Sequence, residues 1–454
     1  MRSCGLMTHS TVPSQAPPHT VSQAVVRANL DSWLYHRERS GRPVPRYVVA
    51  AFRKFLACRT AEAEGVTVAC PRGHYARSFP VRCKGRGLCA YCLTLRQREL
   101  CSQLLQVIGN VPIVHVVLCF PPSLRCTVGH DWRLIRGGFA ALTGAMFAFQ
   151  RRRVKELFRI SKDRVHPGGV VVHHPASANL EPNDHFHGLF PDGVFIEVES
   201  GGVEFLRLPA LTNEDIARIA HQAGLRYCRA LKACGFWKAT SSSGDTIEGL
   251  LELGGGRPAR LKFFGEAARY AEGGKQPRNG AYAFHLFVSR AVKQSQVKDL
   301  VSYVLAPAFR DDQVEWDGAG KVGFTLKRER HDGTGRVEFD PHDFLDCLAE
   351  LVPRRKAKSV RYFGIYGGRA RLRTQALAVR VEGHPPIERC PGPELRKCPV
   401  CGEKLQVVQA ARLQGGSSSA IPPDTPEGLN TGEGGGSGNR DEEGIQGGLL
   451  VNTG

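Results

Sequence analysis

The segment NDHFHGLFPDGVFIEV, residues 183–198, decides the expected fold because it joins a histidine pair to a strand-like pattern. Successive side chains of a β-strand point to opposite faces, so His185 and His187 share one face while Phe186 lies on the other. Two neighbouring imidazoles can bind one divalent metal ion. Because the chain has sixteen histidines, such a pair is also common by chance, and the surrounding sequence must decide its meaning.

Strand and helix patterns surround this segment. Residues 111–122, VPIVHVVLCFPP, and residues 168–174 are rich in β-branched residues, which predicts two buried strands. Apolar residues at helical spacing predict a helix over 132–158, and a capping box of Thr212 and Asp215 begins another. The sequence therefore predicts an α+β domain built around the histidine pair.

A metal-polarised phosphodiester needs a nucleophile, and a tyrosine phenol is one candidate. Tyr303 lies in SQVKDLVSYVLAP, residues 295–307, where apolar spacing predicts a short helix that Pro307 ends. The alternative is a tyrosine buried in the core. Tyr362 and Tyr366 have the spacing of one helix face, but the glycines around them favour a surface strand or loop. Among these three tyrosines Tyr303 is the preferred candidate, and the pattern alone leaves a core position open.

Cysteines cluster in CPRGHYARSFPVRCKGRGLCAYC, residues 70–92. A segment with so few apolar residues cannot stabilise itself, whereas a structural zinc ion can contribute on the order of 10 kcal/mol of folding free energy. His74 competes for a ligand position, and free buried cysteines are the alternative to a zinc site. The expected ligands are Cys70, Cys83, Cys89 and Cys92.

A second CxxC motif, Cys398 and Cys401, is a possible second zinc site, with Cys390 and His384 as candidate further ligands. A single CxxC motif also arises by chance in a chain with fifteen cysteines. Basic side chains around the first cluster are suited to phosphate oxygens, so we expect them to contact DNA. These residues are Arg72, Arg77, Lys84 and Arg86.

The composition indicates a polyanionic partner. The 454 residues carry a formal net charge of +19, which attracts nucleic acid, although a solvated basic surface is the simpler alternative. Neither a signal-like start nor an apolar stretch long enough to span a membrane is present in the sequence, so we expect a reducing cytoplasm without membrane association. In that compartment clustered cysteines more often bind metal than form disulfides.

Taken together, these motifs resemble the rolling-circle transposases of the IS91 and ISCR type, within the HUH endonuclease superfamily. The resemblance covers about residues 65–405, and its blocks occur in the family order. The blocks are CPRGH at 70–74, CKGRGLCAYC at 83–92, PIVHVVLCFPPSLR at 112–125, NDHFHGLFPDGVF at 183–195, LVSYVLAP at 300–307, HDGTGRVEFDP at 331–341, VRYFGIYGGRARLR at 360–373 and CPVCG at 398–402.

The resemblance implies an antiparallel-sheet nuclease domain in which His185 and His187 bind Mg²⁺ or Mn²⁺. It further implies that Tyr303 takes the DNA 5′ phosphate and leaves a free 3′ hydroxyl. The implied substrate is single-stranded DNA at the ends of a mobile element, with host replication proteins as partners and a location at the nucleoid of a bacterial cytoplasm. His173 and His174 are candidates for a third metal ligand.

Two-tyrosine members of this family carry a second tyrosine one helical turn from the first. Here Asp299 and Pro307 stand four residues before and after Tyr303, so the chain resembles a single-tyrosine member. GAGKV, residues 318–322, lacks the Ser or Thr of a phosphate-binding loop, so we expect no built-in helicase. The alternatives are a plasmid relaxase or replication initiator, or a zinc-ribbon DNA-binding protein whose nuclease centre has decayed.

The expected domain organisation follows the changes in composition and motif. A flexible lead precedes a helical and zinc-binding domain, the catalytic domain, a CxxC knuckle, and a tail too polar to bury a core. The expected bounds are 1–24, 25–108, 109–378, 379–413 and 414–454.

Overall fold

The computed structural model describes residues 20–410 except 60–64, 80–81, 122–123, 125–127, 129–130, 178, 244–245, 252–258, 264–283, 290, 328, 331, 355–356, 383 and 385–396. Residues 1–19 of the expected lead, the whole expected tail and Cys390 lie outside the described residues. No helix within the described ranges has the length and apolar composition needed to cross a membrane.

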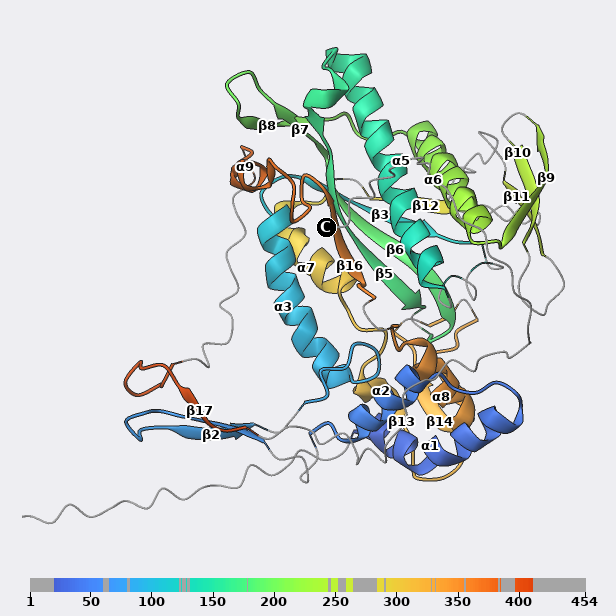
Figure 1. Ribbon diagram of the computed structural model, residues 1–454, viewed down its shortest axis with the longest axis vertical. Coiled ribbons are helices and arrows are strands. Elements are labelled where there is room, and N and C mark those ends of the chain that lie inside the picture. Colours follow the sequence, from blue (N-terminus) through green and yellow to red (C-terminus); the bar gives the residue numbers. More distant parts are fainter. Residues whose placement is uncertain are drawn as a thin grey trace, which may run out of the picture. The chain divides into compact units, whose positions relative to one another are not determined.

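A five-stranded antiparallel sheet carries the histidine pair, in the order β12-β3-β6-β5-β16 (Figure 1). The predicted strand over 111–122 is confirmed as β3, and the predicted strand over 168–174 is confirmed as β5. The α+β class with an antiparallel sheet is therefore confirmed. The strands are β12 (His285–Val288), β3 (Ile113–Cys119), β6 (Pro182–Pro191), β5 (Gly168–Ala176) and β16 (Val360–Gly364).

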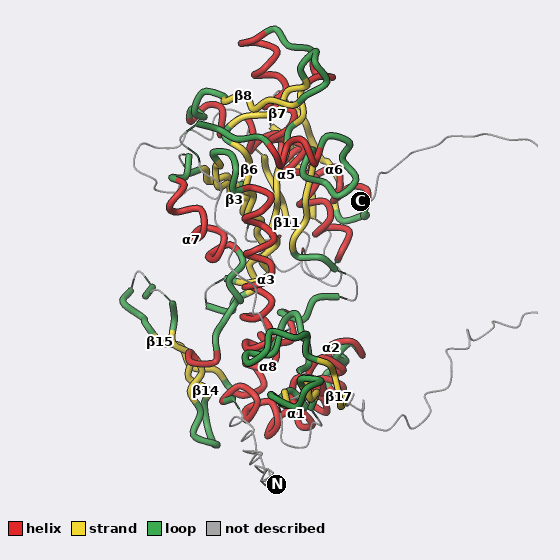
Figure 2. Tube along the Cα trace, turned by 90° about the vertical axis from the view of Figure 1, so that its left-hand side faces the viewer, coloured by secondary structure: helices red, strands yellow, loops and turns green. Residues whose placement is uncertain are grey.

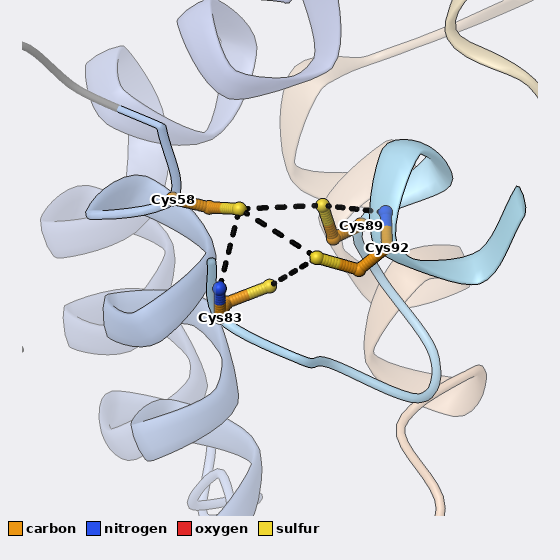
Figure 3. Close-up of side chains that lie close together, drawn as sticks. All are labelled: Cys58, Cys83, Cys89 and Cys92. Carbon is orange, nitrogen blue, oxygen red and sulfur yellow. Dashed lines mark hydrogen bonds between the residues drawn. The ribbon is translucent and has the colours of Figure 1, made fainter. Parts of the chain in front are cut away.

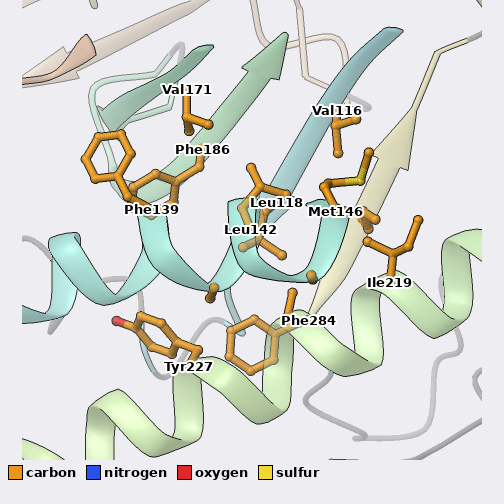
Figure 4. Packing of buried hydrophobic residues seen from close by; sticks show 14 of the residues in the cluster. Val116, Leu118, Phe139, Leu142, Met146, Val171, Phe186, Ile219, Tyr227 and Phe284 are labelled. Atoms are coloured by element: carbon orange, nitrogen blue, oxygen red, sulfur yellow. The ribbon is translucent and has the colours of Figure 1, made fainter. Parts of the chain in front are cut away.

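Helices α5 (Trp132–Phe158) and α6 (Asn213–Ala233) cover one face of this sheet (Figures 1 and 4). Both helices match the sequence-based prediction, and the capping box of Thr212 and Asp215 begins α6 as expected. Phe186 points into this core, where its ring packs edge-on against Phe139 of α5 at a centroid distance of 4.9 Å. The alternation along β6 therefore anchors one face of the strand in the core.

Helices α3 (Ala90–Ile108) and α7 (Gln294–Val304) lie on the opposite face of the sheet (Figure 1). Strand alternation points His185 and His187 to this face, opposite Phe186. Valines of α7 pack with Leu104 and Ile108 of α3 and with apolar residues of β5 and β6. Helix α9 (Arg373–Ala378) contributes Ala376 to the same core. The histidine-bearing face is thus partly covered by α3 and by the helix that carries Tyr303.

A second hydrophobic core joins the N-terminal helices to a segment far along the chain. Trp33 of α1 packs with Phe344 of α8 in this core, and the Trp33 indole donates a 2.8 Å hydrogen bond to Asp346. The Asp311 carboxylate accepts the first backbone N–H groups of α1. The elements are α1 (Val21–Arg39), α2 (Arg46–Leu56), β13 (Val314–Glu315), β14 (Val322–Thr325), β15 (Arg336–Phe339) and α8 (Pro341–Glu350).

This packing shows that residues 309–352 share a core with α1 and α2, although the sequence pattern alone groups them with the catalytic sheet. Strands β14 and β15 pair antiparallel within this segment, from Val322 with Phe339 to Thr325 with Arg336. Helix α3 links the two cores: its N-cap, Cys89, belongs to the second core, whereas its C-terminal half packs on the sheet (Figure 2).

Three further small sheets complete the described part of the chain. In the first, the last strand of the described chain pairs with the first: the strands are β17 (Gln406–Ala410), β1 (Val66–Ala69) and β2 (Ala76–Phe79). The second contains β4 (Val165–His166), β7 (Gly193–Glu197) and β8 (Val203–Arg207), and the third contains β9 (Trp237–Ser243), β10 (Thr246–Leu251) and β11 (Ala259–Phe263). Single 3-10 turns occur at Lys162–Arg164 and Asp311–Gln313.

Candidate active site and cysteine clusters

Three imidazoles gather on one face of the central sheet. His174 of β5 pairs in register with His185 of β6, and strand alternation places His187 on the same face. One ring nitrogen from each of the three lies within 4.8 Å of the others. The geometry therefore brings together the predicted histidine pair and one of the two candidates for a third ligand.

His173, the other candidate, points to the opposite face of β5. Its Nε2 lies 2.5 Å from Asp184 Oδ1, and its ring lies 5.0 Å from the ring of Phe186. Because neighbouring residues of a strand face opposite ways, His173 and His174 cannot both reach the histidine group. His173 instead forms a buried pair with Asp184 beneath the sheet.

Each imidazole of the group is held through one nitrogen. His174 Nε2 donates to the Val304 carbonyl oxygen at 2.6 Å, and His185 Nδ1 donates to the Asn183 carbonyl oxygen at 2.6 Å. His187 Nδ1 lies 2.8 Å from Nε2 of His115, a β3 residue that no sequence motif marks as functional. A ring fixed through one nitrogen can present its other nitrogen to a metal ion in a defined direction.

Burial favours the neutral form of His174, His187 and His115. Burial, with a smaller contribution from His185, lowers the pKa of His174 to about 3. Burial also lowers the pKa of His115 to about 4 and lowers that of His187 still further, with neighbouring histidines adding to the effect on His187. Neutral imidazole is the form that binds metal, so the protonation state near neutral pH suits a metal site.

Tyr303 lies at the edge of the histidine group. Its side chain is 57% exposed, while Val301 and Val304 on the same helix are buried. Its ring stands edge-on to His187 at a centroid distance of 5.8 Å and to His115 at 6.3 Å. Tyr303 is therefore not the buried core tyrosine that was the alternative, and a bound substrate can reach it.

The other tyrosine pair has a different environment. Tyr362 lies on β16, which confirms the strand expected there, and Tyr366 follows the strand. The expectation of a surface position is wrong for Tyr366, which is 1% exposed and packs edge-on against Phe195. Burial raises the pKa of both phenols, which disfavours the phenolate form that a nucleophile needs.

Four thiols form a compact cluster between α2 and α3 (Figure 3). Cys58 Sγ lies 3.7 Å from Cys89 Sγ and 3.8 Å from Cys92 Sγ, and the Cys83 and Cys92 sulfurs are 3.6 Å apart. Four sulfurs at about 2.3 Å from a tetrahedral zinc ion would be about 3.8 Å apart, so this cluster fits zinc. We call these four residues cluster 1.

Backbone amides support thiolate charge in cluster 1. The N–H of Cys83 donates to Cys58 Sγ at 3.3 Å, and the N–H of Gly85 donates to Cys83 Sγ at 3.3 Å. Lys84 adopts a left-handed conformation, with φ of 50°, in the turn between them. A non-glycine residue rarely adopts this φ, so the surrounding structure must hold the turn in place.

The structure corrects the expected ligand set, because Cys70 does not belong to cluster 1. Cys58 is the fourth sulfur there, whereas Cys70 lies with His74, Cys398 and Cys401 in a second group, which we call cluster 2. Cys70 follows β1, and the pairing of β1 with β2 and β17 holds Cys70 near β17 and away from residues 83–92. His384, a candidate further ligand of the C-terminal pair, is not in cluster 2.

Comparison with protein families identifies the two regions separately. A family described as "Transposase zinc-binding domain", found in IS91 transposases, matches residues 26–120, and one described as "Putative transposase" matches residues 168–373. The chain belongs to the IS91 transposases. Neither a curated protein nor a solved structure matched it.

Membership of this family implies what the protein acts on and where it holds zinc. This transposase acts on DNA, and structural zinc belongs to its N-terminal domain. The zinc-binding match includes all of cluster 1 but only Cys70 and His74 of cluster 2. The second match includes the three histidines and Tyr303.

A basic groove lies beside cluster 1 of the transposase. It has a volume of about 610 Å³ and is bordered by α2, by the cysteine turn and by Val352 and Pro353. Four cations line it, and none of the described residues that line it is acidic. The cations are Arg46, Lys54, Lys84 and Arg86.

The four predicted DNA contacts therefore have different surroundings. Lys84 and Arg86 line the groove, and Arg86 also donates to the Ala357 carbonyl oxygen. Burial, and to a lesser degree the charge of Arg96, lowers the pKa of Arg86. Arg72 forms a 2.7 Å ion pair with Glu403, whereas the Arg77 guanidinium lies 5.2 Å from the centroid of the Phe79 ring.

Proposed function

We propose that this transposase cuts and rejoins single-stranded DNA at the ends of a mobile element through a covalent 5′-phosphotyrosine on Tyr303. The observation that carries the proposal is the approach of Tyr303 to the histidine group. Its ring meets His187 edge-on, and the next residue, Val304, accepts the hydrogen bond from His174. The nucleophile and the candidate metal ligands are thus joined by direct contacts.

His174, His185 and His187 are the proposed ligands of a divalent ion, Mn²⁺ or Mg²⁺. Their close spacing and the hydrogen bonds that orient each ring support this assignment, as does the burial that lowers the pKa of His174 and His187. Such an ion would act as a Lewis acid on a phosphodiester oxygen. Imidazole suits transition metals better than Mg²⁺, so Mn²⁺ is the first ion to use in experiments.

The proposed reaction conserves bond energy. The phenol oxygen of Tyr303 attacks the phosphorus atom, the bond from phosphorus to the 3′ oxygen breaks, and the phenol proton leaves as the 3′ oxygen gains one. The products are a 5′ phosphate bound to Tyr303 and a free 3′ hydroxyl. Attack by another 3′ hydroxyl reverses these steps and rejoins the strand. With a single tyrosine, one chain holds one covalent strand at a time.

The basic groove supports binding of the DNA backbone. Arg46 and Lys54 on α2 face the same groove as Lys84 and Arg86 on the cysteine turn, so four cations are available to phosphates. Proteins that bind single strands combine such a charged groove with aromatic rings on which bases stack, and Tyr47 also lines this groove. Host replication proteins would supply the strand separation and synthesis that this reaction requires.

The test uses labelled single-stranded oligonucleotides from both ends of the mobile element, the full-length protein and Mn²⁺. We expect a protein–DNA adduct that survives boiling in detergent, that Tyr303→Phe and His187→Ala abolish, and that Tyr362→Phe retains. Adduct formation only on plasmid origin sequences would identify a relaxase or initiator instead. DNA binding without any adduct would identify a binding protein with an inactive nuclease centre.

A further inference from the structure

The C-terminal CxxC motif lies against the turn between β1 and β2, at the end of the sheet that these strands form with β17. Strand β17 pairs antiparallel with β1, from Val66 with Ala410 to Ala69 with Gln406. Strand β1 also pairs with β2, so it is the central strand of this sheet. Residues more than 300 positions apart in sequence are therefore neighbours here.

Two similar turns meet at the end of this sheet. In the first, Gly73 N–H donates to the Cys70 carbonyl at 2.9 Å, and Cys70 N–H donates to the Tyr75 carbonyl at 2.7 Å. In the second, Gly402 N–H donates to the Cys398 carbonyl at 2.9 Å, and Cys398 N–H donates to the Glu403 carbonyl at 2.7 Å. Both Gly73 and Gly402 have a positive φ, of 75° and 71°, which glycine adopts without strain.

The ligand atoms of the two turns converge in cluster 2. Cys70 Sγ lies 3.5 Å from Cys401 Sγ and 3.9 Å from His74 Nδ1, and all four ligand atoms lie within 4.8 Å of one another. Around a tetrahedral zinc ion, sulfur–sulfur and sulfur–nitrogen separations would be about 3.8 and 3.6 Å. We propose that Cys70, His74, Cys398 and Cys401 bind a second structural zinc ion that joins the β1–β2 hairpin to the C-terminal CxxC turn.

The surroundings of cluster 2 show why a metal ion is needed. The sheet has short strands; Val407 and Val408 of β17 are 61% and 63% exposed, and Val400 of the CxxC turn is 69% exposed. A small sheet that leaves its apolar side chains in water has little hydrophobic stabilisation of its own. Zinc supplies stability at such sites, because its ligands are brought together only when the segment folds.

A single ion pair across the two turns cannot take over this role. Arg72 and Glu403 contact each other at 2.7 Å, but their side chains are 67% and 39% exposed. Exposed ion pairs contribute little to stability because water and salt screen them. Loss of the C-terminal cysteines would therefore leave Cys70 and His74 as an incomplete site and release the hairpin that carries Arg72 and Arg77.

The experiment counts zinc in the full-length chain. All variants also carry His185→Ala and His187→Ala, so that the histidine group contributes no metal to the count. Zinc per chain is measured by elemental analysis and by intact mass under native conditions. We expect two zinc ions in this parent, one after Cys398→Ser with Cys401→Ser, and one after His74→Ala.

Three matched controls make the ligand set specific. His74→Cys replaces one zinc ligand with another and should retain two ions. Cys234→Ser alters a half-buried cysteine outside both clusters and should also retain two. Cys390→Ser tests the other candidate ligand near the CxxC pair, and loss of an ion in this variant would overturn the ligand set.

Other results would also overturn the proposal. A single zinc ion in the parent, or two ions after loss of Cys398 and Cys401, would contradict it. A parent mass lower by about two hydrogens would also contradict it, because that loss indicates a disulfide. If the variants do not fold, zinc-edge X-ray absorption of the parent decides alone. We expect a total of seven sulfur ligands and one nitrogen ligand for the two zinc ions together. A total of eight sulfur ligands, or of only four, would contradict the ligand set of cluster 2.

Discussion

His174 Nε2 donates a 2.6 Å hydrogen bond to the carbonyl oxygen of Val304, the residue that follows Tyr303. The bond links β5, which lies between β6 and β16 in the sheet, to the last turn of α7. It also fixes the His174 tautomer, because Nε2 carries the proton and Nδ1 is the unprotonated nitrogen. A change at His174 should therefore affect both metal binding and the position of the nucleophile.

We predict that His174→Ala weakens Mn²⁺ binding by at least tenfold and slows adduct formation further, because it removes a proposed ligand and the bond to Val304. Titration with Mn²⁺, followed by electron paramagnetic resonance, measures the affinity. His173→Ala is the matched control: it should destabilise the fold by leaving Asp184 buried without its partner, yet retain Mn²⁺ affinity. Equal losses of affinity in both variants would exclude His174 as the third ligand.

Helix α3 should contribute to catalysis by holding α7 in place. The Gln97 side-chain amide donates a 2.7 Å hydrogen bond to the Ser302 carbonyl, the residue before Tyr303. Gln97→Ala removes about 1 kcal/mol of interaction, so we predict adduct formation about fivefold slower in single-turnover assays with normal zinc content. Gln103→Ala, at an exposed position on the same helix, should leave the rate unchanged. A normal rate in Gln97→Ala would show that α7 does not depend on this bond.

The core beneath the histidine pair leaves no space at Gly138 of α5. A Cβ atom there would lie 2.3 Å from the Phe186 ring, whose residue stands between His185 and His187. Gly138→Ala should therefore lower the free energy of unfolding by about 1–3 kcal/mol despite the better helix propensity of alanine. At Gly144 the nearest atoms belong to the flexible Arg226 side chain, so Gly144→Ala should be neutral or stabilising. Denaturant unfolding compares the two variants, and equal stability would contradict the packing.

The groove predicts a specific salt dependence of DNA binding. Arg46→Gln with Lys54→Gln should weaken binding of single-stranded DNA and reduce the slope of log K against log salt by about 1.4, because each phosphate contact contributes about 0.7. Fluorescence anisotropy at several salt concentrations measures this slope. Lys162→Gln, which removes a cation on a 3-10 turn remote in sequence from the groove, should leave the slope unchanged. An unchanged slope in the double variant would place the DNA elsewhere.

Much of the catalytic half follows from local sequence patterns. Strand alternation alone places His185 and His187 opposite Phe186, and apolar spacing alone places Tyr303 on a short helix. The same rule would have distinguished His174 from His173, if the register between β5 and β6 were known. That register depends on pairing between segments, which periodicity within each segment does not specify.

The cysteine clusters show where local patterns are insufficient. Cys58 stands alone after α2, with no second cysteine at zinc-ligand spacing, so the sequence gives no sign that it joins Cys89 and Cys92. Cys70 and Cys401 meet only because β1 and β17 pair across the length of the chain. One signal was present: Cys70 with His74 forms a half-site, which needs the other half-site at Cys398 and Cys401.

The placement of residues 309–352 also depends on long-range packing. The amphipathic pattern of α8 predicts which face is buried, but it does not indicate that Trp33 of α1 is the partner of that face. The first residues of α1 likewise depend on Asp311, which lies almost 300 positions away in sequence. Only the folded chain reveals these partners.

The most direct test of the central proposal is to identify the residue that carries the DNA. The adduct formed with a mobile-element oligonucleotide and Mn²⁺ is digested with nuclease and protease, and the peptides are sequenced by mass spectrometry. We predict a nucleotide linked through its 5′ phosphate to Tyr303, in a peptide from α7. A nucleotide on Tyr362, on another side chain, or linked through a 3′ phosphate would contradict the proposed chemistry.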